Sequence, residues 1–336
     1  MMFWRKSETG AHALKRRRVP RASCVALAGV LAVAGCAGGE GGEGTNIADN
    51  FSLSDPQGTL RLAVGSKDFT EQEVLGEITI QALEAAGAEV IDKTGLGSTE
   101  EVRLALASGS IDMYWEYTGT GWLVHLAEPE SIADSEELYE AVRAEDAEQN
   151  GIEWLAPAPA NNTYAIAVRE DAGEGIDLEN ISELRSLIEE SPEKATLCVG
   201  PEFSSRADGL PGLERAYGFE FPADQVFVVS ESTVYGAVSK GAKCNFGSVY
   251  QTNGRIPELG LNLLNDDETF FAAYNPALTM RQATLDSYPE LKEIFAPITE
   301  LLDTEALRDL SSAVDVEGNS PATVAERWLR DNGFVS

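Results

Sequence analysis

The sequence predicts an α/β fold, because strand-like and helix-like segments alternate along most of the chain. Its 336 residues suffice for one large domain or two of ordinary size, with ample apolar material for a buried core. Hydrophobic residues make up 43% of the chain and charged residues 24%, proportions typical of a soluble globular protein. This composition excludes an intrinsically disordered chain and a multi-span membrane protein.

Short runs rich in β-branched and aromatic residues predict the strands. In chain order they occupy residues 60–64, 90–91, 111–117, 162–168, 195–199, 225–229, 243–249, 261–264 and 270–278. Apolar residues at helical spacing predict the helices between them. These span residues 70–86, 98–108, 135–150, 181–190, 213–217 and 233–240, and the tail from 288 to 333 is mostly helical.

Local signals mark the ends of several predicted helices. Thr70 with Glu73, and Ser98 with Glu101, have the spacing of a capping box at a helix start. Glycines that end a helix by turning the backbone follow three of the helices, and these are Gly87, Gly109 and Gly151.

The N-terminal segment has the layout of a secretory signal. Residues 1–35 hold seven Lys and Arg against one acid, and their apolar stretch, 22–35, is too short to span a bilayer. The stretch ends at Cys36 in a pattern that resembles the bacterial lipobox, where the cysteine thiol receives a lipid; an ordinary cleavage site beside an incidental cysteine is the alternative. Glycines and acids over residues 37–57 predict a flexible tether, so the protein is expected to be anchored to the membrane through lipid at Cys36.

The charge excludes two classes of partner. The formal net charge is −31, and without the basic signal residues 36–336 hold 18 Lys and Arg against 55 Asp and Glu, a charge of −37. Nucleic-acid binders need basic patches to neutralise phosphates, so nucleic acid is excluded, and so is docking on anionic lipid through the protein surface.

Two cysteines remain for a disulfide. Cys24 lies within the signal and Cys36 is taken by lipid, which leaves Cys198 and Cys244, both in strand-like runs of an exported protein. We expect these two to pair, with two separate buried thiols as the alternative.

Familiar catalytic and cofactor motifs do not occur in this sequence. After the signal the only histidine is His125, which we interpret as a surface or packing residue, and no His and Cys cluster suits zinc. There is no Gly-x-Ser-x-Gly elbow, no phosphate-binding loop and no complete dinucleotide fingerprint. We therefore expect no cofactor, no metal and no enzymatic activity, although a hydrolase that uses two carboxylates stays open.

Four tyrosines lie near strand ends, beside loop-forming residues. They are Tyr117, Tyr164, Tyr250 and Tyr274. Tyrosines that converge there would surround a quaternary ammonium group, which has no N–H to donate and is held instead by the negative faces of aromatic rings. Spacing alone favours the simpler interpretation of four unrelated core or surface positions.

A family resemblance changes that balance. The matching motifs, in order, are residues 64–72 (VGSKDFTEQ), 76–77, 96–99, 108–112, 116–121 (EYTGTG), 162–165, 206–208, 217–219, 250–255, 270–276 and 321–325. Together they strongly resemble the glycine betaine/carnitine/choline-binding lipoproteins of osmoprotectant ABC importers across residues 59–333. The motifs at residues 64–72 and 116–121 are specific to the family, whereas the matches in helical segments are not.

The resemblance implies a periplasmic-binding-protein-like (type II) fold with two α/β lobes joined by two crossover strands. Signal peptide (1–35) and lipid anchor with linker (36–58) precede a first lobe of 59–160 with 268–336 and a second lobe of 161–267. The crossovers are expected at 161–168 and 261–267.

The resemblance also assigns the site. The positions that match the family's tyrosine cage are Tyr117, Tyr164, Tyr250 and Tyr274. The positions that match the residues holding the polar end of the ligand are Thr120, Asn162, Lys67, Thr70 and Gln72. Trp115, where relatives often carry proline, is a departure, and strand alternation turns Glu116 away from Tyr117.

The implied function is extracytoplasmic capture of quaternary ammonium osmoprotectants (glycine betaine, choline or carnitine) by a monomer, on the outer face of the cell membrane, for an ABC permease. The alternatives are a binding protein for an amino acid or polyamine, and the hydrolase above.

Overall fold

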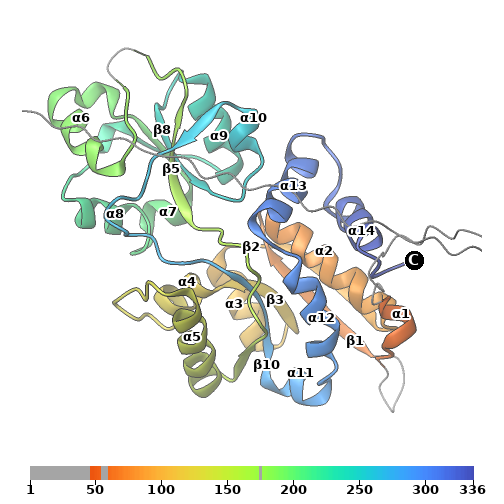
Figure 1. Ribbon diagram of the computed structural model, residues 1–336. Helices are drawn as coiled ribbons and strands as arrows, with labels where there is room; N and C mark the ends of the chain where they lie inside the picture. Colours follow the sequence, from red (N-terminus) through yellow and green to blue (C-terminus); the bar gives the residue numbers. More distant parts are fainter. Residues whose placement is uncertain (1–45, 54–59, 174–175) are drawn as a thin grey trace, which may run out of the picture. The chain divides into compact units, whose positions relative to one another are not determined.

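The fold consists of two five-stranded sheets, each with its own helices (Figure 1). The computed structural model describes residues 46–53, 60–173 and 176–336. The expected signal, the lipidation site at Cys36 and most of the tether lie outside the described residues. Among the helices in the described ranges, none is long and apolar enough to cross a membrane.

The first sheet has the strand order β2-β1-β3-β10-β4. β1 is parallel to β2 and β3, whereas β10 is antiparallel to β3 and β4. The strands are β1 (Arg61–Lys67), β2 (Glu89–Gly97), β3 (Met113–Tyr117), β4 (Ile152–Trp154) and β10 (Pro276–Arg281). We call this sheet and the helices packed on it the first lobe. Its helices are α1 (Ile47–Asn50), α2 (Thr70–Ala85), α3 (Thr99–Ser108), α4 (Thr118–Thr120), α5 (Ser135–Asn150), α11 (Gln282–Ser287), α12 (Leu291–Glu300), α13 (Thr304–Asp315) and α14 (Pro321–Asp331).

Both faces of the central strands β1, β3 and β10 are buried, whereas the edge strand β2 is largely exposed, and the alternation of side chains shows how. In β1, Leu62 and Val64 pack into a cluster with α2, α12, α13 and α14, while Ala63 packs into a second cluster with α3 and α5. In β3, Trp115 belongs to the first cluster and Tyr114 to the second. Near-continuous apolar strands are therefore required here, because neither face meets water.

The second sheet has the strand order β7-β6-β8-β5-β9. β6 is parallel to β7 and β8, and β5 is antiparallel to β8 and β9. The strands are β5 (Tyr164–Arg169), β6 (Leu197–Val199), β7 (Val226–Val228), β8 (Phe246–Tyr250) and β9 (Leu261–Leu263). We call this sheet and its helices the second lobe. Its helices are α6 (Leu184–Glu190), α7 (Pro201–Ser205), α8 (Leu210–Tyr217), α9 (Glu231–Lys240) and α10 (Arg255–Glu258).

A disulfide joins two elements of the second lobe. Cys198 in β6 and Cys244, just before β8, are bonded, with Cα atoms 5.6 Å apart. Both side chains are fully buried in the cluster between the sheet and α9.

Two segments connect the lobes, and they run side by side (Figure 1). The first lies between β4 and β5 and the second between β9 and β10. The backbone amide of Asn162 donates to the Tyr274 carbonyl at 3.0 Å, and the backbone amide of Tyr274 donates to the Asn161 side-chain oxygen at 2.8 Å. Both connections differ from the predicted crossovers, because residues 164–168 form part of β5 and residues 261–263 pair with β5 inside the second sheet.

Two predicted local features are wrong. The capping box at Thr70 does not form: α2 starts after Phe69, and the Thr70 hydroxyl donates instead to Asp315 Oδ1 at 2.7 Å. The predicted strand over 270–278 is a strand only from Pro276, since Asp266 accepts the amides of Phe270 and Phe271 and so withdraws them from any sheet. By contrast, the capping box of Ser98 and Glu101 is confirmed.

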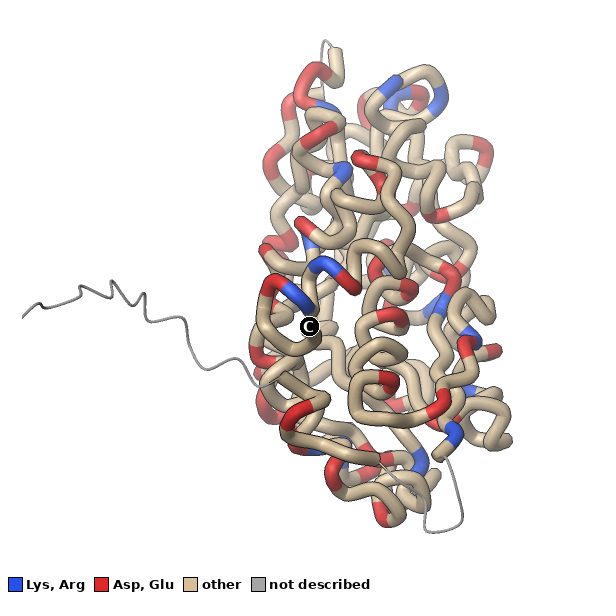
Figure 2. The backbone as a smooth tube through the Cα atoms, turned by 90° about the vertical axis from the view of Figure 1, so that its right-hand side faces the viewer, with Lys and Arg blue, Asp and Glu red and all other residues tan. Residues whose placement is uncertain are grey.

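Acidic residues are spread over both lobes (Figure 2). Basic residues are fewer, and several of them are paired with acids. The acidic residues are therefore distributed along both lobes and not gathered in one segment.

Candidate functional site

A cavity of about 420 Å³ is lined by residues of both lobes. Its lining follows the carboxyl ends of parallel strands, where open α/β sheets form ligand sites. Lys67 ends β1 and Tyr117 ends β3 in the first lobe, while Tyr250 ends β8 in the second. Tyr164 begins β5, which is antiparallel to β8, so its side chain reaches the same edge.

Five aromatic rings form one wall of the cavity, each ring near the next. The ring centroids of Tyr117 and Phe69 lie 6.3 Å apart, those of Phe69 and Tyr250 5.2 Å, and those of Tyr250 and Tyr164 5.1 Å. Tyr274 meets Tyr164 edge-on at 5.8 Å. Three segments of the first lobe and its connections thus share an aromatic surface with two strands of the second, and we call these five residues the aromatic cage.

Two cage hydroxyls donate to buried carboxylates. Tyr117 Oη donates to Glu71 Oε1 at 2.7 Å, and Tyr274 Oη donates to Asp208 Oδ2 at 2.5 Å. Burial raises the pKa of Tyr117 and of Tyr274, and the charge of Asp208 raises the pKa of Tyr274 further. The phenols therefore stay neutral at physiological pH, and their hydrogen bonds fix the ring orientations and polarise the rings.

A glycine allows Tyr274 to reach the cage. A Cβ atom on Gly119 would lie 2.8 Å from the Ala273 carbonyl oxygen and 2.9 Å from the Tyr274 ring. Any larger residue would displace that ring, which gives a physical reason for the first glycine of the Tyr-Thr-Gly-Thr-Gly run.

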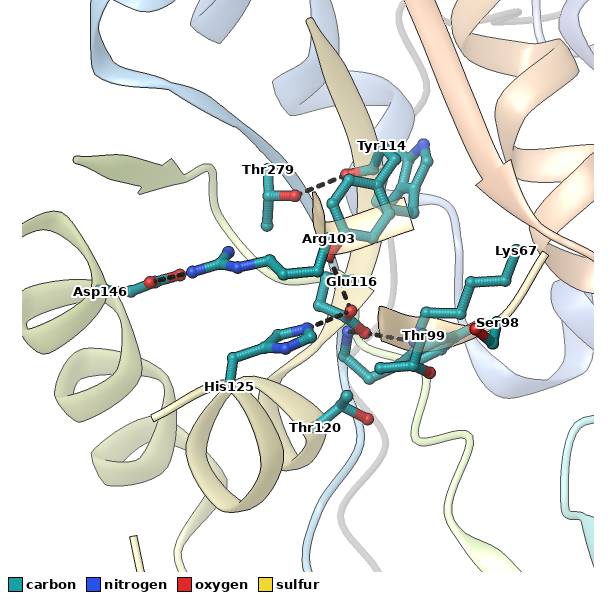
Figure 3. Close-up of polar contacts among 12 residues, drawn as sticks. Lys67, Ser98, Thr99, Arg103, Tyr114, Glu116, Thr120, His125, Asp146 and Thr279 are labelled. Carbon is teal, nitrogen blue, oxygen red and sulfur yellow. Dashed lines mark hydrogen bonds and ion pairs between the residues drawn. The ribbon is translucent and has the colours of Figure 1, made fainter. Parts of the chain in front are cut away.

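A buried charged cluster lies beside the cage in the first lobe (Figure 3). Glu116 is fully buried, and its carboxylate contacts Lys67 Nζ at 2.7 Å, His125 Nε2 at 2.8 Å and Tyr114 Oη at 2.9 Å. Burial alone would raise the pKa of Glu116, but Lys67 and His125 together hold it well below its usual range. Lys67 Nζ in turn lies 5.2 Å from the Tyr117 ring centroid, so Glu116 acts on the cage through Lys67.

Arg206 brings a second cation to the cavity, from the second lobe. Its guanidinium pairs with Glu202 at 2.9 Å and Asp208 at 2.5 Å, and lies 3.4 Å from the Thr120 hydroxyl. Its Cζ atom is 5.9 Å from the Tyr164 ring centroid. Glu202 also accepts from the amide and hydroxyl of Thr99 in the first lobe, at 2.8 and 2.9 Å. This end of the cavity is polar and joins the lobes.

Glu231, at the start of α9, adds a negative group to that polar end. Burial raises the pKa of Glu231 to about 7, with further contributions from Glu202 and Asp68, while Arg206 opposes them. Its Oε1 atom is buried and makes no hydrogen bond.

Most of the predicted site residues line the cavity. These are Tyr117, Tyr164, Tyr250, Tyr274, Thr120, Asn162, Lys67 and Thr70. Gln72 lies apart from the lining, since its amide nitrogen donates to the Trp115 carbonyl at 2.9 Å and its oxygen accepts from the Lys67 amide at 3.3 Å. Glu116 is likewise absent from the lining, in line with strand alternation.

Sequence reasoning missed several lining residues. Phe69 lies within the most specific motif, but the predicted cage consists of tyrosines alone. Arg206 also belongs to a matching motif, whereas Glu231 carried no signal in the sequence. No group of three or more His, Cys, Asp or Glu side chains is arranged for a metal ion within the part of the chain that the structure describes.

The sequence matches one protein family over residues 61–331, the OpuAC family, described as the substrate binding domain of ABC-type glycine betaine transport systems. The glycine betaine-binding protein YehZ of Escherichia coli is 35% identical over 284 residues, which cover 83% of this chain and 93% of that protein. A glycine-betaine-binding protein of Pseudomonas aeruginosa is also 35% identical, over 95% of this chain and 96% of its own.

The fold has matches among solved structures. The ligand-free structure of Escherichia coli YehZ superposes with a TM-score of 0.60 at 35% identity, covering 81% of this chain and 99% of that one. A crystal structure described as a glycine betaine/carnitine/choline ABC transporter has a TM-score of 0.65 at 24% identity, covering 80% and 98%, and supports the two-lobe fold.

Proposed function

Because this chain belongs to the OpuAC family of ABC-transporter substrate-binding domains, we propose that it captures quaternary ammonium osmoprotectants of the glycine betaine, choline and carnitine type. The observation that carries the proposal is the aromatic cage, in which five rings from both lobes line one cavity. The cage would hold the ammonium group, for which each ring face contributes about 0.5–2 kcal/mol.

The polar end of the cavity suits the other end of such a ligand. Thr120 and Arg206 supply donors for a carboxylate or hydroxyl, and Asn162 lies between the cage and the lobe contacts. Lys67 is nearby but is already paired with Glu116. Closure of the lobes around the ligand would complete the cage, so the ligand selects the closed state by its higher affinity for it.

The remaining assignments complete the proposal. The protein acts as a monomer and not as an enzyme, passes its ligand to an ABC permease, and is held outside the cell membrane by lipid on Cys36. The basic and apolar segment before Cys36 supports the anchor. Cys36→Ala is expected to move the protein from the membrane fraction to the soluble extracytoplasmic fraction, whereas retention in the membrane would contradict lipidation at this cysteine.

A thermal-shift panel tests the ligand class. Glycine betaine, choline, carnitine, proline betaine and ectoine are added to purified protein, and a ligand at 100 times its Kd stabilises the native state by about 2.7 kcal/mol. The matched control for choline is 3,3-dimethyl-1-butanol, which has the same shape without the charge. We expect a shift with choline or glycine betaine and none with the neutral alcohol. No shift with any quaternary amine would overturn the proposal, and an equal shift with the neutral alcohol would overturn the cation–π basis.

A further inference from the structure

The lobes meet at a buried group of side chains that forms no ion pair. Glu71, near the start of α2, is only 5% exposed and faces Tyr117, Asn162 and Thr252. Thr252 belongs to the second lobe, just beyond β8, while Glu71 belongs to the first. Among the described residues, no Lys, Arg or His lies within ion-pair distance of Glu71.

Four close contacts connect these side chains. Glu71 Oε1 lies 2.7 Å from Tyr117 Oη and 2.8 Å from the Asn162 amide nitrogen, and Glu71 Oε2 lies 2.5 Å from Thr252 Oγ1. Thr252 Oγ1 also lies 2.7 Å from the Asn162 amide oxygen. Each contact is short enough to require a hydrogen between its two atoms.

An ionised Glu71 leaves the group one hydrogen short. Tyr117 and Thr252 supply one hydrogen each, and the Asn162 amide directs one N–H into the group, so three hydrogens serve four contacts. Reversing the Asn162 amide does not help, because its oxygen then faces Glu71 Oε1, again with no hydrogen between them. A proton on Glu71 completes the network in either orientation.

We propose that Glu71 carries a proton while the lobes are in contact, and that this proton forms the hydrogen bond that fastens Thr252 of the second lobe to the ligand cavity. Glu71 is thus a positioning residue: it orients Tyr117 in the cage and ties lobe closure to proton uptake. The proposal rests on the proposed function, because ligand capture is what closure serves.

The surrounding charges do not stabilise an ionised Glu71. Burial raises the pKa of Glu71, and the three hydrogen bonds only partly offset that effect. Lys67 on β1 is paired with Glu116, and Asp315 on α13 pairs with Arg255 of α10.

Two further charged groups and the start of a helix lie around this network. Arg308 of α13 donates to the carbonyl of Gln251, the residue before Thr252. From α9, Glu231 lines the same cavity and is negative when ionised. The start of α2 favours a negative charge, but its dipole acts in a site where the charge would have no counter-ion.

The sign of the pH effect follows. In separated lobes a solvated Glu71 returns toward the ordinary pKa of 4.5, so above that pH closure must take up a proton. Affinity then falls by up to tenfold for each pH unit until the raised pKa of the closed state is reached. Ionisation of Glu231 as the pH rises has the opposite effect: it increases the affinity for a cationic ligand, because it adds an attractive charge near the cavity.

The test compares wild type, Glu71→Gln and Glu77→Gln by titration calorimetry with choline from pH 5 to 8, in pairs of buffers with different ionisation enthalpies. Gln imitates the protonated carboxyl, because its N–H₂ reaches Thr252 and its oxygen accepts from Tyr117 and Asn162. Glu77 is the matched control, on the same helix, half-buried and with a pKa raised by burial, but outside the cavity. Comparing the proteins cancels the effect of Glu231.

For each choline bound, we expect wild type and Glu77→Gln to take up more protons than Glu71→Gln does, with a difference of at most one proton. Glu71→Gln should match wild type within about threefold at pH 5 and bind at least tenfold more tightly at pH 8. Equal proton uptake and equal pH slopes in wild type and Glu71→Gln would overturn the inference while leaving the proposed function intact. Infrared difference spectra of wild type with and without saturating choline follow carboxyl protonation on closure even if the variant is unstable, and no gain of a protonated carboxyl band at pH 7 would also overturn the inference.

Discussion

Truncation of Tyr250 should show how much one ring of the cage contributes to binding. The Tyr250 ring lies between Phe69 at 5.2 Å and Tyr164 at 5.1 Å, so Tyr250→Ala removes one cation–π face and the support of two neighbouring rings. A cation–π contact is worth about 0.5–2 kcal/mol and an aromatic pair about 0.5–1.5 kcal/mol. We expect a loss of about 1.4–2.7 kcal/mol in binding, which is tenfold to hundredfold in Kd.

The assay is titration calorimetry with choline and glycine betaine at fixed pH and salt. Tyr250→Phe keeps the ring and should stay within about threefold of wild type. Tyr288→Ala, an aromatic truncation against the core of the first lobe and outside the cavity lining, controls for general loss of packing. The backbone amide of residue 250 still donates to Tyr235 Oη in the variant, which keeps this end of β8 in place.

A melting temperature for each variant separates weak binding from unfolding. If Tyr250→Ala melts as a folded protein and binds both ligands within threefold of wild type, the cage does not hold the ammonium group. An equal loss in Tyr250→Phe and Tyr250→Ala would instead assign the effect to the hydroxyl.

Two further predictions concern stability. Replacing Cys198 and Cys244 by Ala should lower the free energy of unfolding by about 2–4 kcal/mol, because the disulfide closes a loop with a sequence separation of 46. Urea unfolding of the variant, and of wild type with and without reductant, measures this loss. Equal stability with and without the disulfide would contradict its role. Glu116→Gln should cost about 3 kcal/mol because Lys67 loses its buried counter-ion, whereas Glu89→Gln, in an exposed pair with Arg61, should cost less than about 1 kcal/mol. The folded state depresses the pKa of Glu116, so its contribution to the free energy of unfolding is present above about pH 4.5 and is lost as the pH falls. Urea unfolding at several acidic pH values should show that the free energy of unfolding falls less steeply with acid in Glu116→Gln than in wild type. Equal slopes in the two proteins would refute this account.

Predictions from the sequence are correct where the signal that carries them is local. The capping box at Ser98 and Glu101 involves residues three apart, so the pattern is complete within one turn of chain. The same spacing at Thr70 and Glu73 failed, because Asp315, 245 residues away, accepts the Thr70 hydroxyl in the folded protein. Likewise Phe270 and Phe271 have strand-like side chains, but Asp266 takes the amides that a sheet would need.

The site was predictable to the extent that it is written in motifs. The four tyrosines all line the cavity, but only the family resemblance brought them together, since spacing alone favoured unrelated positions. Glu231 has no local pattern at all, and its raised pKa arises from burial and from Glu202 and Asp68, which come from distant parts of the chain.

By itself the sequence determined the α/β class, the order of most strands and helices, the OpuAC family and the tyrosines of the cage, because apolar periodicity, caps and motifs are properties of neighbouring residues. Tertiary structure alone decided that Phe69 completes the cage, that Glu116 is neutralised by Lys67, and that Glu71 meets Thr252. The physical reason is that charge, hydrogen-bond supply and ring contact depend on which distant side chains share a buried space, and two lobes from interleaved parts of one chain create that space only when folded.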